Sequence, residues 1–86
     1  MTTFERLQAM LARDFDLEPG VLSAAATLES LDIDSLRLIE ILFSIEDAFG
    51  ITVSAEQSEI RSRVRTLGDL AGYIDELVAA KAEPAR

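Results

Sequence analysis

The sequence predicts an all-α fold, a small four-helix bundle with three main helices and a short third one. Apolar residues recur at the three- and four-residue intervals typical of helices, and no useful length of strand-like alternation is present. Three segments open with Ser or Thr followed three residues later by an acid or amide, a capping-box pattern. These pairs are Thr2–Glu5, Ser54–Gln57 and Thr66–Asp69.

The first helix is expected at about residues 3–14, after the Thr2 cap. Its apolar side consists of Phe4, Leu7, Met10 and Leu11. Pro19 and Gly20 then interrupt the periodicity, so we expect a long loop up to the second helix. A long loop needs apolar anchors, and we expect four of its residues to pack on the core: Phe15, Leu17, Val21 and Leu28.

The second helix is expected at about residues 35–49, with Asp34 or Ser35 capping its free amides. Gly50 follows where a left-handed C-terminal residue is wanted, and Ile51 then folds back. A short third helix is expected at about 55–63. The fourth is expected at about 67–80, with an apolar stripe of Leu67, Leu70, Ile74, Leu77 and Val78.

Eighty-six residues are enough for one domain, expected at 1–80, with a fraying tail at 81–86. Eight basic and sixteen acidic residues give a net charge of −8, which disfavours nucleic-acid binding. The chain has neither cysteine nor histidine, which excludes disulfides, thiolate metal sites and histidine-based triads. We therefore expect no metal site and no catalytic residues.

The first ten residues contain an early acid and no long apolar run, so no secretory signal is predicted. No apolar segment approaches the roughly 20 residues needed to span a membrane. We expect a cytoplasmic monomer without a membrane span.

The second helix has two apolar faces when its residues are advanced by about 100° each. The buried stripe is predicted to contain Leu38, Leu42, Ile45 and Phe49, flanked by Ile41 and Ala48. A second set lies on the other side: Leu36, Ile39 and Phe43, beside Glu40, Glu46 and Asp47. Exposed apolar groups ringed by charge are typical of docking surfaces. The alternative is that the long loop or the third helix covers this set, Ile39 above all.

Ser35 has helix capping as its ordinary role at this position. Nucleophilic catalysis is disfavoured, because a serine hydroxyl needs a base and the chain has no histidine. The free amides and dipole of a helix N-terminus favour an attached phosphate, so Ser35 is a candidate phosphoryl acceptor. Asp32 and Asp34 suggest a calcium loop, but Leu36 stands where another oxygen ligand is needed.

The segment "LDIDSL" followed by "IEILFSIEDAFGITV" resembles the phosphopantetheine attachment region of acyl carrier proteins. "ATLESL" is similar to the family's approach to the serine, and "TLGDLAGYIDEL" to its last helix, so the resemblance covers most of the chain. It implies that a phosphopantetheinyl transferase moves 4′-phosphopantetheine from coenzyme A to Ser35. An acyl group is then carried as a thioester on the terminal thiol, by a carrier without catalytic activity of its own.

The resemblance also implies roles for the neighbours of Ser35. Asp34 would help to engage the transferase. The expected partner-binding residues are Leu36, Arg37, Ile39, Glu40, Phe43, Glu46 and Asp47, which would meet basic and apolar patches on acyl-transferring or acyl-modifying enzymes of fatty-acid, lipid or polyketide-type biosynthesis. Two alternatives stay open, an unmodified helical interaction module with the carrier fold and a carrier of aminoacyl or peptidyl groups.

Three departures from the family pattern favour a specialised bacterial-type carrier. Asp32 stands where the family often has glycine, which makes the approach to the serine less flexible. Arg37 takes a position that is commonly acidic. The segment between the second and fourth helices is longer than usual and carries Arg61, Arg63 and Arg65, which we expect on a solvated face.

Overall fold

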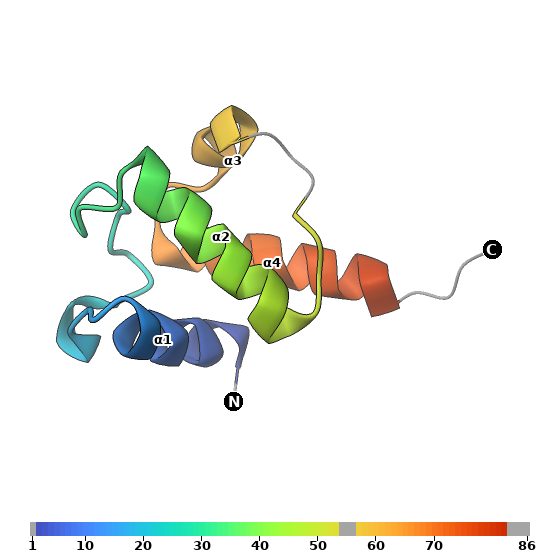
Figure 1. Cartoon of the computed structure of the whole chain (residues 1–86), viewed down its shortest axis with the longest axis horizontal. Helices are drawn as coiled ribbons and strands as arrows, with labels where there is room; N and C mark the ends of the chain where they lie inside the picture. The colour runs from blue at the N-terminus through green and yellow to red at the C-terminus, as the bar shows by residue number, and fades with distance from the viewer. Residues whose placement is uncertain (1, 54–56, 83–86) are drawn as a thin grey trace.

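Four α-helices and one 3-10 helix follow one another in the computed structural model, which describes residues 2–53 and 57–82 (Figure 1). They are α1 (Thr3–Asp14), η1 (Pro19–Val21), α2 (Ser35–Phe49), α3 (Gln57–Arg63) and α4 (Leu67–Ala82). The described residues otherwise contain one isolated bridge, between Thr27 and Thr66. The predicted all-α class is confirmed. In that described part, no helix is long and apolar enough to cross a membrane.

The observed bounds of α1 and α2 coincide with the expected 3–14 and 35–49. The expected end of α4 at residue 80 was wrong, since the helix continues through Ala82. Lys81 donates a hydrogen bond to the Gly50 carbonyl at the end of α2, which holds the last turn of α4 in place. The expected start of α3 at 55, the capping box opened by Ser54 and residues 83–86 lie outside the described residues.

Two capping boxes form as the sequence predicts. At α1, Thr2 Oγ1 accepts the Glu5 N–H at 3.1 Å, and Glu5 Oε1 accepts the Thr2 N–H at 2.9 Å. At α4, Asp69 Oδ2 accepts the N–H groups of Arg65 and Thr66 at 3.1 and 3.3 Å, while Thr66 Oγ1 accepts the Asp69 N–H. The backbone hydrogen bonds from Arg65 and Thr66 lower the pKa of Asp69 below its ordinary 3.8.

We expect Asp69→Asn to reduce the loss of stability on acidification. The pKa of Asp69 is lower in the folded protein, so its carboxylate stabilises the fold fully above the unfolded pKa of about 3.9. That contribution is lost as the pH falls through the lower folded pKa. Urea unfolding from about pH 6 to pH 3 should therefore show a shallower decline for Asp69→Asn than for wild type. Asp47→Asn controls for loss of one charge, and equal slopes for Asp69→Asn and wild type would contradict the expectation.

The core is formed where α1, α2 and α4 meet, with the loop and α3 closing its sides (Figure 1). Ten large side chains are less than 2% exposed: Leu7, Leu11, Leu22, Leu38, Ile41, Ile45, Ile60, Leu67, Leu70 and Ile74. Each main helix contributes residues at helical spacing, so the apolar stripes predicted for the three helices account for most of the core.

The loop before α2 contains η1, which the sequence analysis missed. Val21 was expected as an anchor and is instead 47% exposed, because η1 turns the chain so that Leu22 takes the buried position. The other expected anchors do pack on the core: Leu28 is buried, and Phe15 and Leu17 are partly buried.

The last turns of α4 extend beyond the end of α2 (Figure 1). Val78, expected in the buried stripe, is therefore exposed, and Leu77 is only partly buried. The predicted stripe is thus correct for Leu67, Leu70 and Ile74 and weakens towards the end of the helix.

The loop that leads to α2 is fixed against the start of α4. The Leu28 N–H donates to the Arg65 carbonyl at 3.0 Å, and the Gly68 N–H donates to the Ala24 carbonyl at 2.9 Å. A Cβ at Gly68 would lie 3.0 Å from that Ala24 oxygen, so glycine permits the close approach. These contacts set the position from which the chain enters α2.

Candidate functional site

The start of α2 is built by Asp34 and Ser35. Asp34 is the N-cap residue, with extended backbone, and its Oδ1 accepts the Arg37 N–H at 2.8 Å. Ser35 is the first helical residue and is exposed. Of the two residues that the sequence offered as the cap, Asp34 forms it. The Arg37 amide is therefore capped by Asp34.

A tight turn delivers the chain to this helix start. The Asp32 N–H donates to the Glu29 carbonyl at 3.1 Å, and the Ile33 N–H donates to the Leu28 carbonyl at 3.0 Å. Asp32 has a φ of 57°, a left-handed conformation that glycine adopts freely and that aspartate tolerates better than most residues. A glycine would adopt this conformation without strain, and aspartate is one of the few other residues that tolerate it, so Asp32 can occupy the position.

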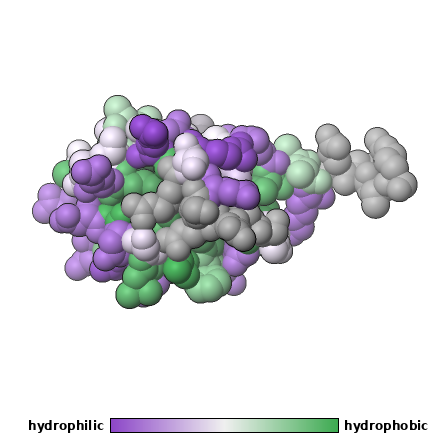
Figure 2. All heavy atoms as spheres, turned by 90° about the horizontal axis from the view of Figure 1, so that it is seen from above, coloured by the Kyte–Doolittle hydropathy of each residue, from purple (hydrophilic) through white to green (hydrophobic). Residues whose placement is uncertain are grey.

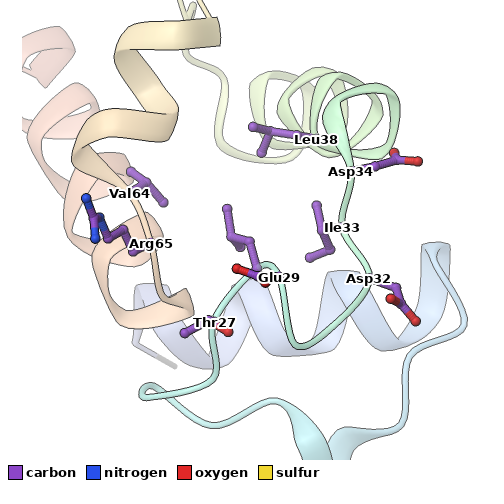
Figure 3. A pocket seen from close by; sticks show the side chains of 9 residues that line it. Thr27, Glu29, Asp32, Ile33, Asp34, Leu38, Val64 and Arg65 are labelled. Carbon is purple, nitrogen blue, oxygen red and sulfur yellow. The ribbon is translucent and has the colours of Figure 1, made fainter.

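A depression of about 740 Å³ lies beside the start of α2. It is lined by Thr27, Leu28, Glu29, Asp32, Ile33, Asp34, Leu38, Val64 and Arg65. Leu38 of α2 and Val64 of the α3–α4 junction point towards each other across it, whereas Asp32 and Asp34 direct their carboxylates to one side (Figure 3). Ile33, Leu38 and Val64 thus give the cavity apolar walls, while the Asp32 and Asp34 carboxylates point away from the hollow (Figure 3).

The chemistry at the start of α2 fits a phosphodiester-linked arm. The Ser35 side chain is exposed to an incoming enzyme, and the N-terminal end of a 15-residue helix stabilises negative charge on an attached phosphate. The cavity lined by Asp34 offers space beside the start of α2. Within residues 2–53 and 57–82, no group of three or more acidic side chains is placed to hold a metal ion.

The second apolar face of α2 is exposed in the part of the chain that the structure describes. Leu36 is 68% exposed, Phe43 65% and Ile39 36%, so the loop and α3 leave the first two uncovered. Glu40 and Asp47 are also exposed. Figure 2 shows hydrophobic atoms reaching the surface as a group at one edge, among hydrophilic neighbours. We call Leu36, Ile39 and Phe43 the exposed face of α2.

The opposite face of α2 is buried mostly as predicted. Leu38, Ile41, Leu42 and Ile45 are buried. Phe49 was expected on this stripe but is only partly buried, because it ends the helix at the edge of the core and Arg6 covers its ring at 4.3 Å from the centroid. Ala48, expected as a flank of the stripe, is exposed.

The expected partner-binding charges have different surroundings. The Arg37 Nε lies 4.0 Å from Glu40 Oε1, and the guanidinium lies 5.7 Å from the centre of the Phe15 ring. Glu46 is half-buried and its Oε2 accepts the Val53 N–H at 2.7 Å. The structure thus places Arg37, Glu40 and the exposed face together, and turns Glu46 towards the segment that follows α2.

Glu46→Ala should destabilise the domain, because it leaves the half-buried Val53 N–H without its charged acceptor. The expected cost is about 1–3 kcal/mol of unfolding free energy. Glu46→Gln keeps an acceptor oxygen and should retain most of the stability. Asp47→Ala, one residue along on the surface, should change it by less than about 0.5 kcal/mol. Chemical denaturation of the three variants provides the measurement. Equal stability of Glu46→Ala and Asp47→Ala would show that the hydrogen bond from the Val53 N–H to Glu46 does not stabilise the domain.

Of the three arginines expected on a solvated face, Arg63 at the end of α3 and Arg65 just after it are exposed. Arg63 Nη2 lies 3.1 Å from both carboxylate oxygens of Glu76, and its guanidinium lies 5.2 Å from the centre of the Tyr73 ring. Arg65 is exposed at the cavity. The expected solvated face therefore holds for Arg63 and Arg65, although Arg63 also pairs with Glu76, while the side chain of Arg61 lies outside the described part.

Several cavity residues had no role in the sequence analysis, above all Thr27, Glu29 and Val64. No periodic pattern marks them, because the cavity joins the loop, α2 and the α3–α4 junction. The residues just before Asp34 form a turn, which is the one local feature near the cavity. A turn does not indicate that residues 64 and 65 form the opposite side of that cavity.

Comparison with known proteins adds an independent finding. The family described as "Phosphopantetheine attachment site" matches residues 5–74. The acyl carrier protein of Streptococcus pneumoniae serotype 4 (strain ATCC BAA-334 / TIGR4) is 33% identical over 76 residues, which is 88% of this chain and 96% of the relative. The acyl carrier protein of Streptococcus pyogenes serotype M1 is 32% identical over the same shares, and that of Streptococcus thermophilus (strain CNRZ 1066) 29%.

The family match spans most of the chain and includes the start of α2, where Ser35 is exposed and Asp34 caps the helix. The alignments with these relatives cover 96% of each relative and 88% of this chain, so the similarity is not confined to one segment. The prosthetic group of this family is 4′-phosphopantetheine. By fold, site and relationship, the chain belongs to the acyl carrier protein family of phosphopantetheine attachment domains.

Proposed function

We propose that this protein carries acyl intermediates as thioesters on a 4′-phosphopantetheine arm attached to Ser35. It presents them to enzymes of fatty-acid, lipid or polyketide-type biosynthesis. The observation that carries the proposal is the exposed Ser35 as first residue of α2, with the capping done by Asp34. A serine in that place is accessible to a transferase, and attachment there leaves the hydrogen bond between Asp34 and the Arg37 N–H in place.

The attachment step is a transfer from coenzyme A. The Ser35 oxygen forms a bond to the phosphorus next to pantetheine. The bond between that phosphorus and the bridging oxygen of the pyrophosphate breaks, and adenosine 3′,5′-bisphosphate leaves with that oxygen. The serine proton goes to a base of the transferase, since this chain contains no histidine. The N-terminus of α2 stabilises the negative charge that remains on the phosphodiester. When attached, the arm supplies a terminal thiol, which holds the acyl group.

The chain's own part after loading is recognition. We assign Asp34 to engagement of the transferase, because it directly precedes Ser35 at the exposed helix start. We assign the exposed face of α2, with Arg37, Glu40 and Asp47 at its edges, to partner enzymes that offer an apolar pocket and basic groups. Charged rims of this kind govern the rate of encounter and the choice of partner. The carrier itself contributes no catalytic residue, and its monomeric state and cytoplasmic location stay predictions.

The absence of cysteine provides a direct test. The sequence contains no thiol, so a maleimide reagent should label the protein only after a phosphopantetheinyl transferase has attached the arm. The expected result is one label per chain after incubation with coenzyme A, magnesium and transferase, and none without coenzyme A. Failure of several unrelated transferases to introduce a thiol would favour the unmodified interaction module. Intact mass after loading with an acyl or aminoacyl donor then distinguishes the two kinds of cargo.

A further inference from the structure

The helix α3 has one buried side chain among those that the structure describes. Among the α3 side chains that the structure describes, Ile60 is buried, whereas Glu59, Ser62 and Arg63 are exposed. Figure 1 shows α3 on the opposite side of the molecule from α1. The way in which Arg63, its last residue, is held therefore matters for the position of the whole helix.

Arg63 connects α3 to α4 through two contacts at once. Its Nη2 lies 3.1 Å from each Glu76 carboxylate oxygen, and its guanidinium lies 5.2 Å from the centre of the Tyr73 ring. Tyr73 is buried, so the ring is a fixed platform, whereas Glu76 is exposed. A solvent-exposed ion pair alone contributes little, but contact with both carboxylate oxygens and stacking on an aromatic ring define one position for the arginine.

This contact adjoins the cavity beside the start of α2. Val64 follows Arg63 directly, is buried, and forms the cavity wall opposite Leu38 (Figure 3). The Val64 N–H also donates to the Ile60 carbonyl at 2.7 Å, so the end of α3 and the cavity wall move together. On the far side of the junction, the Arg65 carbonyl accepts the Leu28 N–H and is fixed to the loop.

We propose that Arg63 is a latch: with Tyr73 and Glu76 it holds α3 against α4 and so sets how far the cavity wall at Val64 stands from Leu38. Releasing the latch frees α3 between the Glu46–Val53 hydrogen bond at one end and the Arg65–Leu28 hydrogen bond at the other. The importance of this wall for Ser35 and its arm rests on the proposed function, whereas the latch itself is a property of the unmodified chain.

Hydrogen–deuterium exchange of the unmodified full-length chain tests the latch. Arg63→Gln and Glu76→Gln should each accelerate exchange in residues 57–66 by about threefold to fivefold, with little change in α1. The double variant should exchange no faster than Arg63→Gln alone, because that substitution already removes the pair with Glu76. Arg13→Gln is the matched control, since it breaks the exposed Arg13–Asp14 pair at 2.9 Å on α1.

Salt provides a second measurement. Raising ionic strength from about 0.05 to 1 M should accelerate exchange of residues 57–66 in wild type, because screening weakens the pair, and should have little effect in Arg63→Gln. Equal exchange in Arg63→Gln and Arg13→Gln, or acceleration spread evenly over all helices, would overturn the latch. Since no arm is needed, such a failure is separate from a failure of the thiol-labelling assay.

Discussion

Ser35→Ala should abolish attachment of phosphopantetheine and leave the fold intact. The hydroxyl is the group that bonds to phosphorus, and alanine offers no atom in its place. The fold should persist because Asp34, not Ser35, accepts the Arg37 N–H that caps α2, and because Ser35 is exposed. Alanine is also a good helix former at this position, so we expect a change in unfolding free energy below about 1 kcal/mol.

Intact-mass spectrometry after incubation with coenzyme A, magnesium and a phosphopantetheinyl transferase measures the effect. Wild type should gain one arm per chain and Ser35→Ala none. Ser23→Ala is a suitable control, because Ser23 is exposed in the loop before α2 and should not affect the modification. Attachment to Ser35→Ala, or loss of attachment in Ser23→Ala, would place the acceptor elsewhere. Circular dichroism and a thermal melt show that the variant is folded.

The ends of the main helices were predictable because local chemistry sets them. Thr2 and Glu5 satisfy each other's amides at the start of α1. Gly50 adopts a φ of 64° at the end of α2, a conformation that strongly favours glycine. These interactions span only a few residues, and the sequence displays them directly. The end of α4 was not predictable in this way, since the contact of Lys81 with Gly50 joins two distant segments.

Packing in the loop and at helix ends was less predictable. Which of Val21 and Leu22 is buried depends on the short η1 turn, and apolarity alone does not distinguish them. Phe49 is apolar and correctly spaced, yet it lies at the edge of the core, where the Arg6 guanidinium lies over its ring. In both cases the outcome depends on neighbours from other elements.

The candidate site was predictable in its helical part only. Ser35 and the exposed face follow from one helix and its projection, so a sequence is sufficient to place them. The cavity combines residues near 27–34, Leu38 and residues 64–65, and the Arg63 contact with Tyr73 and Glu76 also crosses between helices. Such contacts depend on how α3 and α4 pack, which no periodic pattern specifies.

Ile45→Ala and Phe43→Ala should separate the two faces of α2. Ile45 is 1% exposed, and deleting most of its side chain should cost about 2–5 kcal/mol through lost apolar burial and a residual cavity. This cost is a large part of the unfolding free energy of a typical domain, which is about 5–15 kcal/mol. Phe43 is mostly in solvent, so Phe43→Ala should change the unfolding free energy by less than about 1 kcal/mol. Urea unfolding of both variants and wild type measures the difference.

Binding should show the reverse order. Covering Phe43 in a partner's pocket stabilises a complex by about 1.5–3 kcal/mol, so Phe43→Ala should weaken docking by about tenfold or more. A titration with a phosphopantetheinyl transferase or an acyl-transferring enzyme that binds the wild type measures this. Ile45→Ala, tested at a temperature where it is folded, should bind nearly as well as wild type because Ile45 does not reach the surface. If Phe43→Ala is as unstable as Ile45→Ala, the exposed face belongs to the core; if it binds as tightly as wild type, partners dock elsewhere.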